Sequence, residues 1–191
     1  MNDFELYFRL GYEHITDLNG MDHILFLLGL TAIYQFKHWG RLLGVVTAFT
    51  VGHTVTLVLA AMDVISVNAG LVEFLIPVTI LITGLVNLMP VGQNPKNNLR
   101  IFIALLFGLV HGLGFSNFYR MMTMGDADTW GYLLPFGLGV EVGQLLIVFL
   151  VLLITAILHN FMRLKLRDWN IFNSGLVSGI AVYLMIQTWP F

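Results

Sequence analysis

The sequence Gly20-Met21-Asp22-His23 opens the first strongly apolar run of the chain, which extends from Ile24 to Ile33. It places a carboxylate and an imidazole directly before the start of an apolar segment. Ionisable side chains are costly beside lipid, so those in spanning helices usually face the bundle interior or a watery cavity and mark a functional path. We therefore expect this pair to begin a polar centre inside a membrane bundle.

The composition is that of a membrane protein. Of the 191 residues, 58% are hydrophobic and only 10% are charged, which is outside the range of ordinary soluble domains. Cysteine is absent, so any bound metal must be held by nitrogen and oxygen. The small net charge of −2 argues against nucleic acid as a partner. The first residues are acidic where a cleavable signal would be basic, so we expect none.

The apolar runs predict an all-α, polytopic membrane bundle with about six transmembrane helices. Loops between the runs are short, so we expect one integral membrane domain over residues 1–191. Within it, residues 1–20 form an external or interfacial segment, and residues 21–191 form the bundle. The expected spans are 21–37, 41–62, 66–89, 99–118, 131–158 and 171–189.

Charge placement predicts the orientation, because Lys and Arg accumulate in cytoplasmic loops. Most of the nine basic residues fall on alternate loops, which puts both termini outside. The opening stretch from Phe4 to Leu18 mixes aromatic and charged residues, a pattern suited to a short helix lying in the interface. The protein is thus expected to be a multi-pass protein of the cell (inner) membrane, in contact with the lipid bilayer.

Five ionisable residues on four predicted spans form the main candidate site. In the predicted topology they all fall in the outer half of the bundle or at its midplane. Imidazole and carboxylate are ligands that borderline divalent metals such as Ni, Zn and Co accept. We therefore predict a transition-metal site made by Asp22, His23, His53, His111 and Glu141.

Further residues support this site. Glycines surround both His111 and Glu141. Because small residues let helix backbones approach closely in lipid, we expect the predicted spans 99–118 and 131–158 to bring His111 and Glu141 into contact. Thr50 and Gln144 can orient ligands through hydrogen bonds. His14 can hand metal to the first helix. Glu73 is either a ligand at the entrance or an interfacial charge.

The assembled residues resemble the HupE/UreJ family of hydrogenase and urease accessory membrane proteins. The resemblance implies a nickel, or nickel and cobalt, permease that supplies metalloenzyme maturation. It also implies Asp22 and His23 as metal residues of the first helix, followed by His53 and His111. The matching pieces are Gly11-Tyr12-Glu13-His14-Ile15, Gly20 to Leu27, Ala48 to Thr54, Phe107 to Phe115, and Gly139 to Gln144.

Three functions fit these features. The leading hypothesis is a permease for a divalent transition metal, in which the ion passes His53 toward the cytoplasm. The alternatives are an intramembrane zinc hydrolase acting on a lipid-like substrate, with three protein ligands and an open water position, and a membrane metal sensor or chaperone. Nickel is the expected metal, with zinc or cobalt as alternatives. Compatible partners are further copies of the chain and proteins of metalloenzyme maturation.

Overall fold

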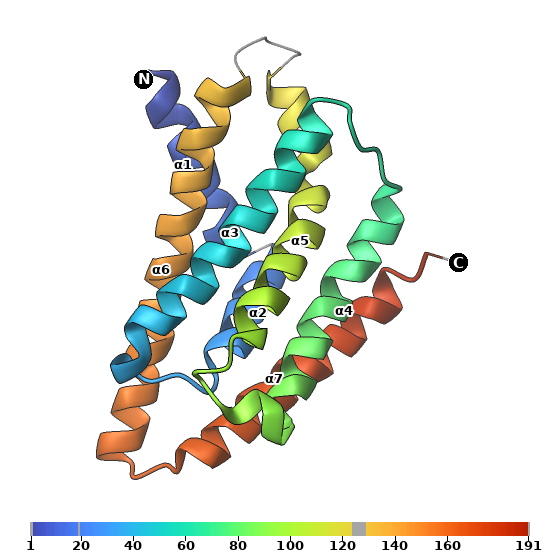
Figure 1. The fold of residues 1–191 in the computed structure, drawn as a ribbon. Helices are drawn as coiled ribbons and strands as arrows, with labels where there is room; N and C mark the ends of the chain where they lie inside the picture. The colour runs from blue at the N-terminus through green and yellow to red at the C-terminus, as the bar shows by residue number, and fades with distance from the viewer. Residues whose placement is uncertain (1, 19, 124–128, 191) are drawn as a thin grey trace.

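The computed structural model of the protein describes residues 2–18, 20–123 and 129–190. Within these residues the chain is all-α and has no strand (Figure 1). In the part of the chain that the structure describes, five helices are long and apolar enough to cross a membrane, which confirms the predicted all-α membrane bundle. The α-helices are α1 (Asp3–Thr16), α2 (Met21–Thr31), α3 (Trp39–Ala61), α4 (Ala69–Leu88), α5 (Leu99–Thr123), α6 (Thr129–Phe161) and α7 (Leu166–Gln187), with short 3-10 helices at Phe36–His38 and Pro90–Gln93.

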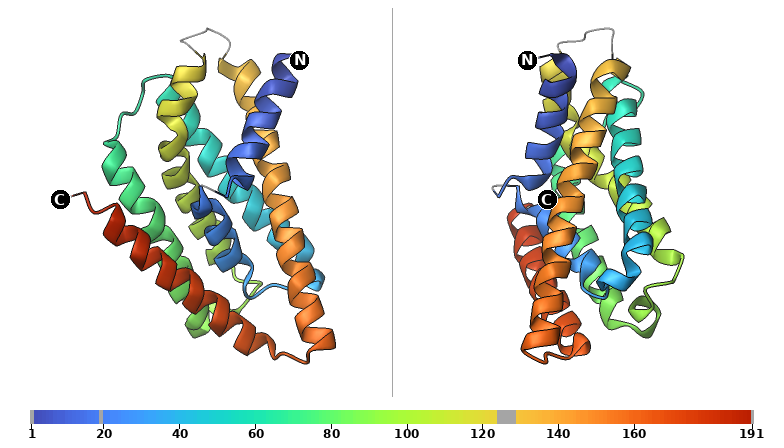
Figure 2. Two further views of the ribbon diagram at one scale, coloured as in Figure 1. Left: turned by 180° about the vertical axis from the view of Figure 1, so that it is seen from behind. Right: turned by 90° about the vertical axis from the view of Figure 1, so that its left-hand side faces the viewer.

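The first predicted span differs from the structure. Helix α2 has 11 residues, or about 16 Å, which is short of the roughly 30 Å hydrocarbon core. The predicted extension to residue 37 is wrong, because the helix ends at Thr31, and Gln35, which has an extended backbone, caps the start of the next, 3-10 helix. Helices α1 and α2 run in the same direction one after the other (Figure 2). The chain therefore enters the bundle as two short helices with a break between them.

Helix α1 packs lengthwise against α6. A Cβ on Gly11 would collide with the carbonyl oxygen of Phe136, and one on Gly139 with that of Phe8, so the two backbones touch. Helix α6 has 33 residues, or about 50 Å, and is longer than a bilayer core requires. Its outer part offers α1 a surface to pack against.

Helices α3 and α5 form the second close pair. A Cβ on Gly108 would collide with the carbonyl oxygen of Phe49, and one on Gly112 with that of His53. Helix α4 packs mainly on α7. Helix α2 lies behind α3 and α5 in Figure 1 and in front of them in the left view of Figure 2. The start of α2 thus lies near α1, α3 and α5 at mid-depth.

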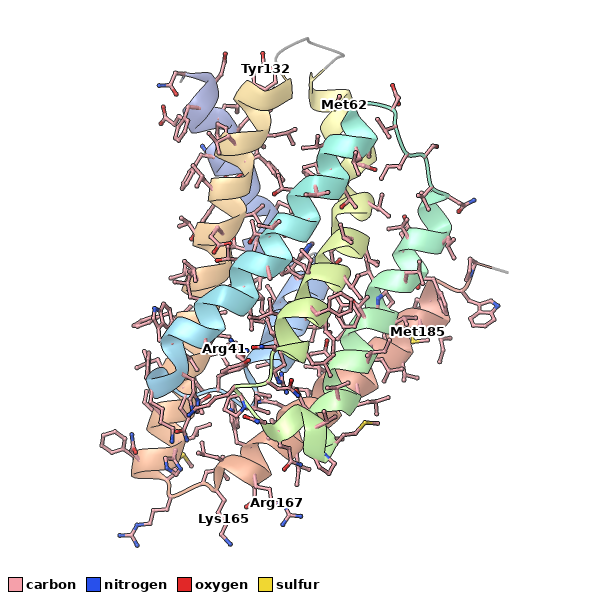
Figure 3. All side chains as sticks on the ribbon, in the orientation of Figure 1. Arg41, Met62, Tyr132, Lys165, Arg167 and Met185 are labelled. Atoms are coloured by element: carbon pink, nitrogen blue, oxygen red, sulfur yellow. The ribbon has the colours of Figure 1, made fainter. Side chains whose placement is uncertain are left out.

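The basic end of the bundle lies opposite the N-terminus. Arg41, Lys165 and Arg167 lie at one end, and Met62 and Tyr132 lie at the other end (Figure 3). The positive-inside rule assigns the basic end to the cytoplasm. Below, this end is called the inner end and the other the outer end.

Candidate metal centre

Three histidines from three helices converge at the break between α1 and α2. His14 lies in the last turn of α1, His23 in the first turn of α2, and His53 on α3. One ring nitrogen of each lies within 4.8 Å of the others. Two nitrogens bound to one ion at about 2.1 Å each are at most about 4.2 Å apart. Small rotations of the rings would therefore let all three bind one metal ion.

Four ring nitrogens of this cluster are buried and have no hydrogen-bond partner among the described residues. Neither ring nitrogen of His53 has a hydrogen-bond partner among the described residues, and the same holds for Nε2 of His14 and of His23. Leaving a buried polar group unsatisfied costs about 1–3 kcal/mol. A bound ion would use these lone pairs, and neutral imidazoles suit nickel, cobalt and zinc. The three rings therefore fit a metal site better than a set of packed core histidines.

Asp22 orients the ring of His23. The Oδ1 atom of Asp22 lies 3.1 Å from Nδ1 of His23 and also accepts a hydrogen bond from the backbone N–H of His23 at 2.9 Å. When Nδ1–H donates to this carboxylate, Nε2 carries the lone pair. Carboxylates that hold a ligand histidine in this way fix its tautomer and raise its basicity. In this tautomer Nε2 of His23 is free to accept a metal ion.

The substitution Asp22→Asn tests this role. It keeps the size of the side chain but removes its negative charge, and outer partners of ligand histidines typically contribute 10–100-fold to metal affinity. We expect nickel affinity to fall by about tenfold or more, with the fold unchanged, when measured by calorimetry on purified protein. An affinity equal to wild type would show that His23 needs no orientation by Asp22.

His111 lies next to the cluster. Its ring centroid is 5.1 Å from that of His23, and its Nε2 atom lies 2.9 Å from the hydroxyl of Thr79 on α4. Its Nδ1 atom is buried without a partner among the described residues. Sequence reasoning missed Thr79, for which the only signal was a hydroxyl inside an apolar run.

An acid-lined cavity of about 810 Å³ borders the cluster. Its wall includes three of the histidines, His14, His23 and His111, and four carboxylates. Three of these carboxylates are exposed, so the cavity reaches the molecular surface. Carboxylates around a cleft attract cations and raise their local concentration. Two of these acids, Glu13 and Asp17, belong to the segment 1–20 that the sequence predicts to be external or interfacial. The four are Glu13, Asp17, Asp22 and Glu73.

Comparison with protein families identifies the family of the chain. The model of the family described as HupE / UreJ protein matches residues 1–189. The chain belongs to the HupE/UreJ family. It is thus a multi-pass membrane protein of a family generally linked to nickel and cobalt uptake. Comparison with curated proteins and with solved structures found no match.

In this HupE/UreJ protein, Glu141 lies in a different polar group. The hydroxyls of Thr47 and Thr50 on α3 donate to its carboxylate, the first at 2.7 Å, and Thr50 also bonds to Gln144 at 2.9 Å. Glu141 lines a separate cavity of about 360 Å³ between α3 and α6. A direct role of Glu141, Gln144 and Thr50 in metal binding stays a prediction.

The expected contact between His111 and Glu141 is not formed. The glycines do bring helices together, but α5 packs on α3 and α6 packs on α1. His111 therefore meets Thr79 and His23, and Glu141 meets the threonines of α3. A small residue permits close approach but does not determine which helix approaches.

Proposed function

We propose that this HupE/UreJ protein is a permease for a divalent transition-metal ion, with nickel as the main substrate and cobalt or zinc as further ones. The observation that carries the proposal is the convergence of ring nitrogens from His14, His23 and His53 within 4.8 Å. Four of their ring nitrogens, Nε2 of His14, Nε2 of His23 and both nitrogens of His53, are buried without a hydrogen-bond partner among the described residues. A cavity lined by carboxylates leads to them.

Each group then has a role in uptake. Glu73 and the acids at the end of α1 attract the hydrated ion into the cavity and replace part of its water. Asp22 holds His23, and the three imidazoles take the ion from the carboxylates. A transport site must bind strongly enough to attract the ion and weakly enough to release it. Exchange between oxygen and nitrogen ligands suits such stepwise transfer.

The donor set limits the choice of metal. Nitrogen and oxygen ligands exclude the thiolate chemistry that selects Cu(I), and they accept nickel, cobalt and zinc. The family link to nickel and cobalt favours nickel among these. On this proposal the released ion passes to proteins of metalloenzyme maturation inside the cell.

Metal binding and flux can be measured on the same protein. Purified protein is incubated with nickel, dialysed and analysed for bound metal, and is then reconstituted in liposomes for uptake, with protein-free liposomes as control. We expect stoichiometric binding that a chelator reverses, and uptake well above the control. The same assays with cobalt and zinc give the order of preference.

Two outcomes would contradict a permease. Zinc that stays bound through dialysis, together with no flux, would favour the intramembrane zinc hydrolase, whose metal is a permanent part of the site. Reversible binding without flux would favour a membrane metal sensor or chaperone.

A further inference from the structure

A line of buried polar side chains continues inward from His111 along α4. Thr79, Thr83 and Asn87 lie on successive turns of this helix, and their exposed fractions are 4%, 5% and 0%. Residues four apart share one helix face, so the three form a continuous polar strip, here called the α4 strip. Polar side chains inside spanning helices join neighbouring helices by hydrogen bonds, as the amide of Asn87 does with the carbonyl oxygen of Gly29 at 2.7 Å, and a continuous series of them also offers oxygen atoms to a passing ion.

The α4 strip joins two cavities. At its outer end, Thr79 bonds to His111, which lines the acid-lined cavity. At its inner end, the side-chain amide of Asn170 on α7 donates to the backbone oxygen of Asn87 at 3.0 Å. Asn170 also lines a cavity of about 520 Å³, together with Gln93 and Arg167. Polar side chains therefore connect the metal centre with a cavity at the basic, inner end.

Arg100 closes the inner end of the strip. Its side chain is only 5% exposed, and it donates to Oδ1 of Asn87 at 2.7 Å and to the carbonyl oxygen of Gly92. Its guanidinium lies 5.7 Å from the centroid of the Tyr34 ring. Among the described residues no carboxylate forms an ion pair with it. The positive charge is thus left without a countercharge in the place where a cation would leave.

We propose that the α4 strip is the inner half of the ion route and that Arg100 is the barrier that closes it. The inference rests on the proposed transport function. The hydroxyls of Thr79 and Thr83 replace waters of the moving ion, as polar groups lining a pore do. The side-chain oxygen of Asn87 already accepts a hydrogen bond from Arg100, and the guanidinium repels cations. Inward release therefore requires Arg100 to move away from Asn87.

The substitution Thr83→Val tests the route. Valine keeps the shape of threonine and removes the hydroxyl, which bonds to the backbone oxygen of Thr79 at 2.9 Å. We expect nickel uptake by proteoliposomes to fall about tenfold, the effect of losing one hydrogen bond to a charged species. Nickel binding at the histidines is expected to stay at the wild-type level.

Thr155→Val is the matched control. Thr155 on α6 is 3% exposed and bonds to the backbone oxygen four residues earlier at 2.7 Å, as Thr83 does, but it lies away from the α4 strip. Its variant is expected to keep wild-type uptake. Equal losses in both variants, or wild-type uptake with Thr83→Val, would overturn the route.

Substitutions of Arg100 test the barrier. With Arg100→Gln we expect faster downhill nickel uptake and a raised proton leak, whereas Arg100→Lys keeps the positive charge and the low leak. A glutamine variant that binds nickel normally but transports no faster than wild type would overturn the barrier. If the glutamine variant does not fold, the proton leak of Arg100→Lys tests the barrier instead. A high proton leak in this variant, which keeps the positive charge, would contradict a barrier made by charge.

These outcomes separate the inference from the function on which it rests. Wild-type protein that neither binds nor transports nickel refutes the permease. Wild-type protein that binds and transports nickel, combined with unchanged flux in Thr83→Val, refutes only the inner route.

Discussion

Alanine in place of His53 is expected to abolish nickel binding and nickel uptake. The imidazole is fully buried, and both of its ring nitrogens lack a partner among the described residues. It is also the ligand that α3 brings to His14 and His23. Even outer-shell partners of metal ligands contribute 10–100-fold, so loss of a direct ligand is expected to weaken affinity by at least about 100-fold. Calorimetry and proteoliposome uptake measure the two effects.

His159→Ala is a suitable control for the loss of an imidazole. His159 is exposed at the inner end of α6, where its Nδ1 atom lies 2.9 Å from the backbone oxygen of Leu164. This variant is expected to bind and transport nickel as wild type does. A His53→Ala protein that folds and keeps wild-type affinity would show that the metal lies elsewhere in the bundle.

Gly112→Ala is expected to lower the stability of the whole bundle and to weaken the metal site. A Cβ at this position would collide with the carbonyl oxygen of His53 and with the hydroxyl of Thr56, so α5 would have to move away from α3. Overpacking of this kind costs roughly 1–3 kcal/mol, which for a chain of this size lowers the melting temperature by about 2–12 °C. Because His53 lies at the contact, we expect nickel affinity to fall as well. Thermal unfolding in detergent measures the first effect and calorimetry the second.

Gly44→Ala separates this clash from the ordinary effect of alanine in a helix. Gly44 lies inside α3, and a Cβ there would meet nothing within 4 Å. Alanine in a helix interior is favoured over glycine by about 1 kcal/mol, so this variant is expected to be as stable as wild type or slightly more so. If both variants melt at the same temperature, close contact between α3 and α5 is not important for stability.

The sequence predicted the later helices well. Runs such as 66–89 and 131–158 lie within a few residues of α4 and α6, because a spanning segment is defined by length and hydrophobicity alone. The first span was predicted too long because Ile33 and Tyr34 continue the apolar run. The helix ends at Thr31, where the backbone N–H groups of Ala32 and Tyr34 bond to carbonyl oxygens three residues earlier, a local change that hydropathy does not detect.

The site was predicted in part. Spacing along the chain gives depth in the membrane, and His23, His53 and His111 do lie close together. It does not give the direction in which a side chain points when a helix is apolar on all sides. Glu141 was therefore placed with His111, although its helix turns it toward Thr47 and Thr50. His14 was given a secondary role because α1 looked like a surface helix, and only its packing on α6 brings its ring inward.

The pairing of α1 with α6 has a consequence for synthesis of the protein. His14 is held in place by a helix whose partner begins at Thr129 and is therefore synthesised after α2, α3, α4 and α5. Until then α1 lacks the surface of α6 against which Gly11 packs. The three histidines can therefore come together as they do in the finished fold only after α6 has been synthesised.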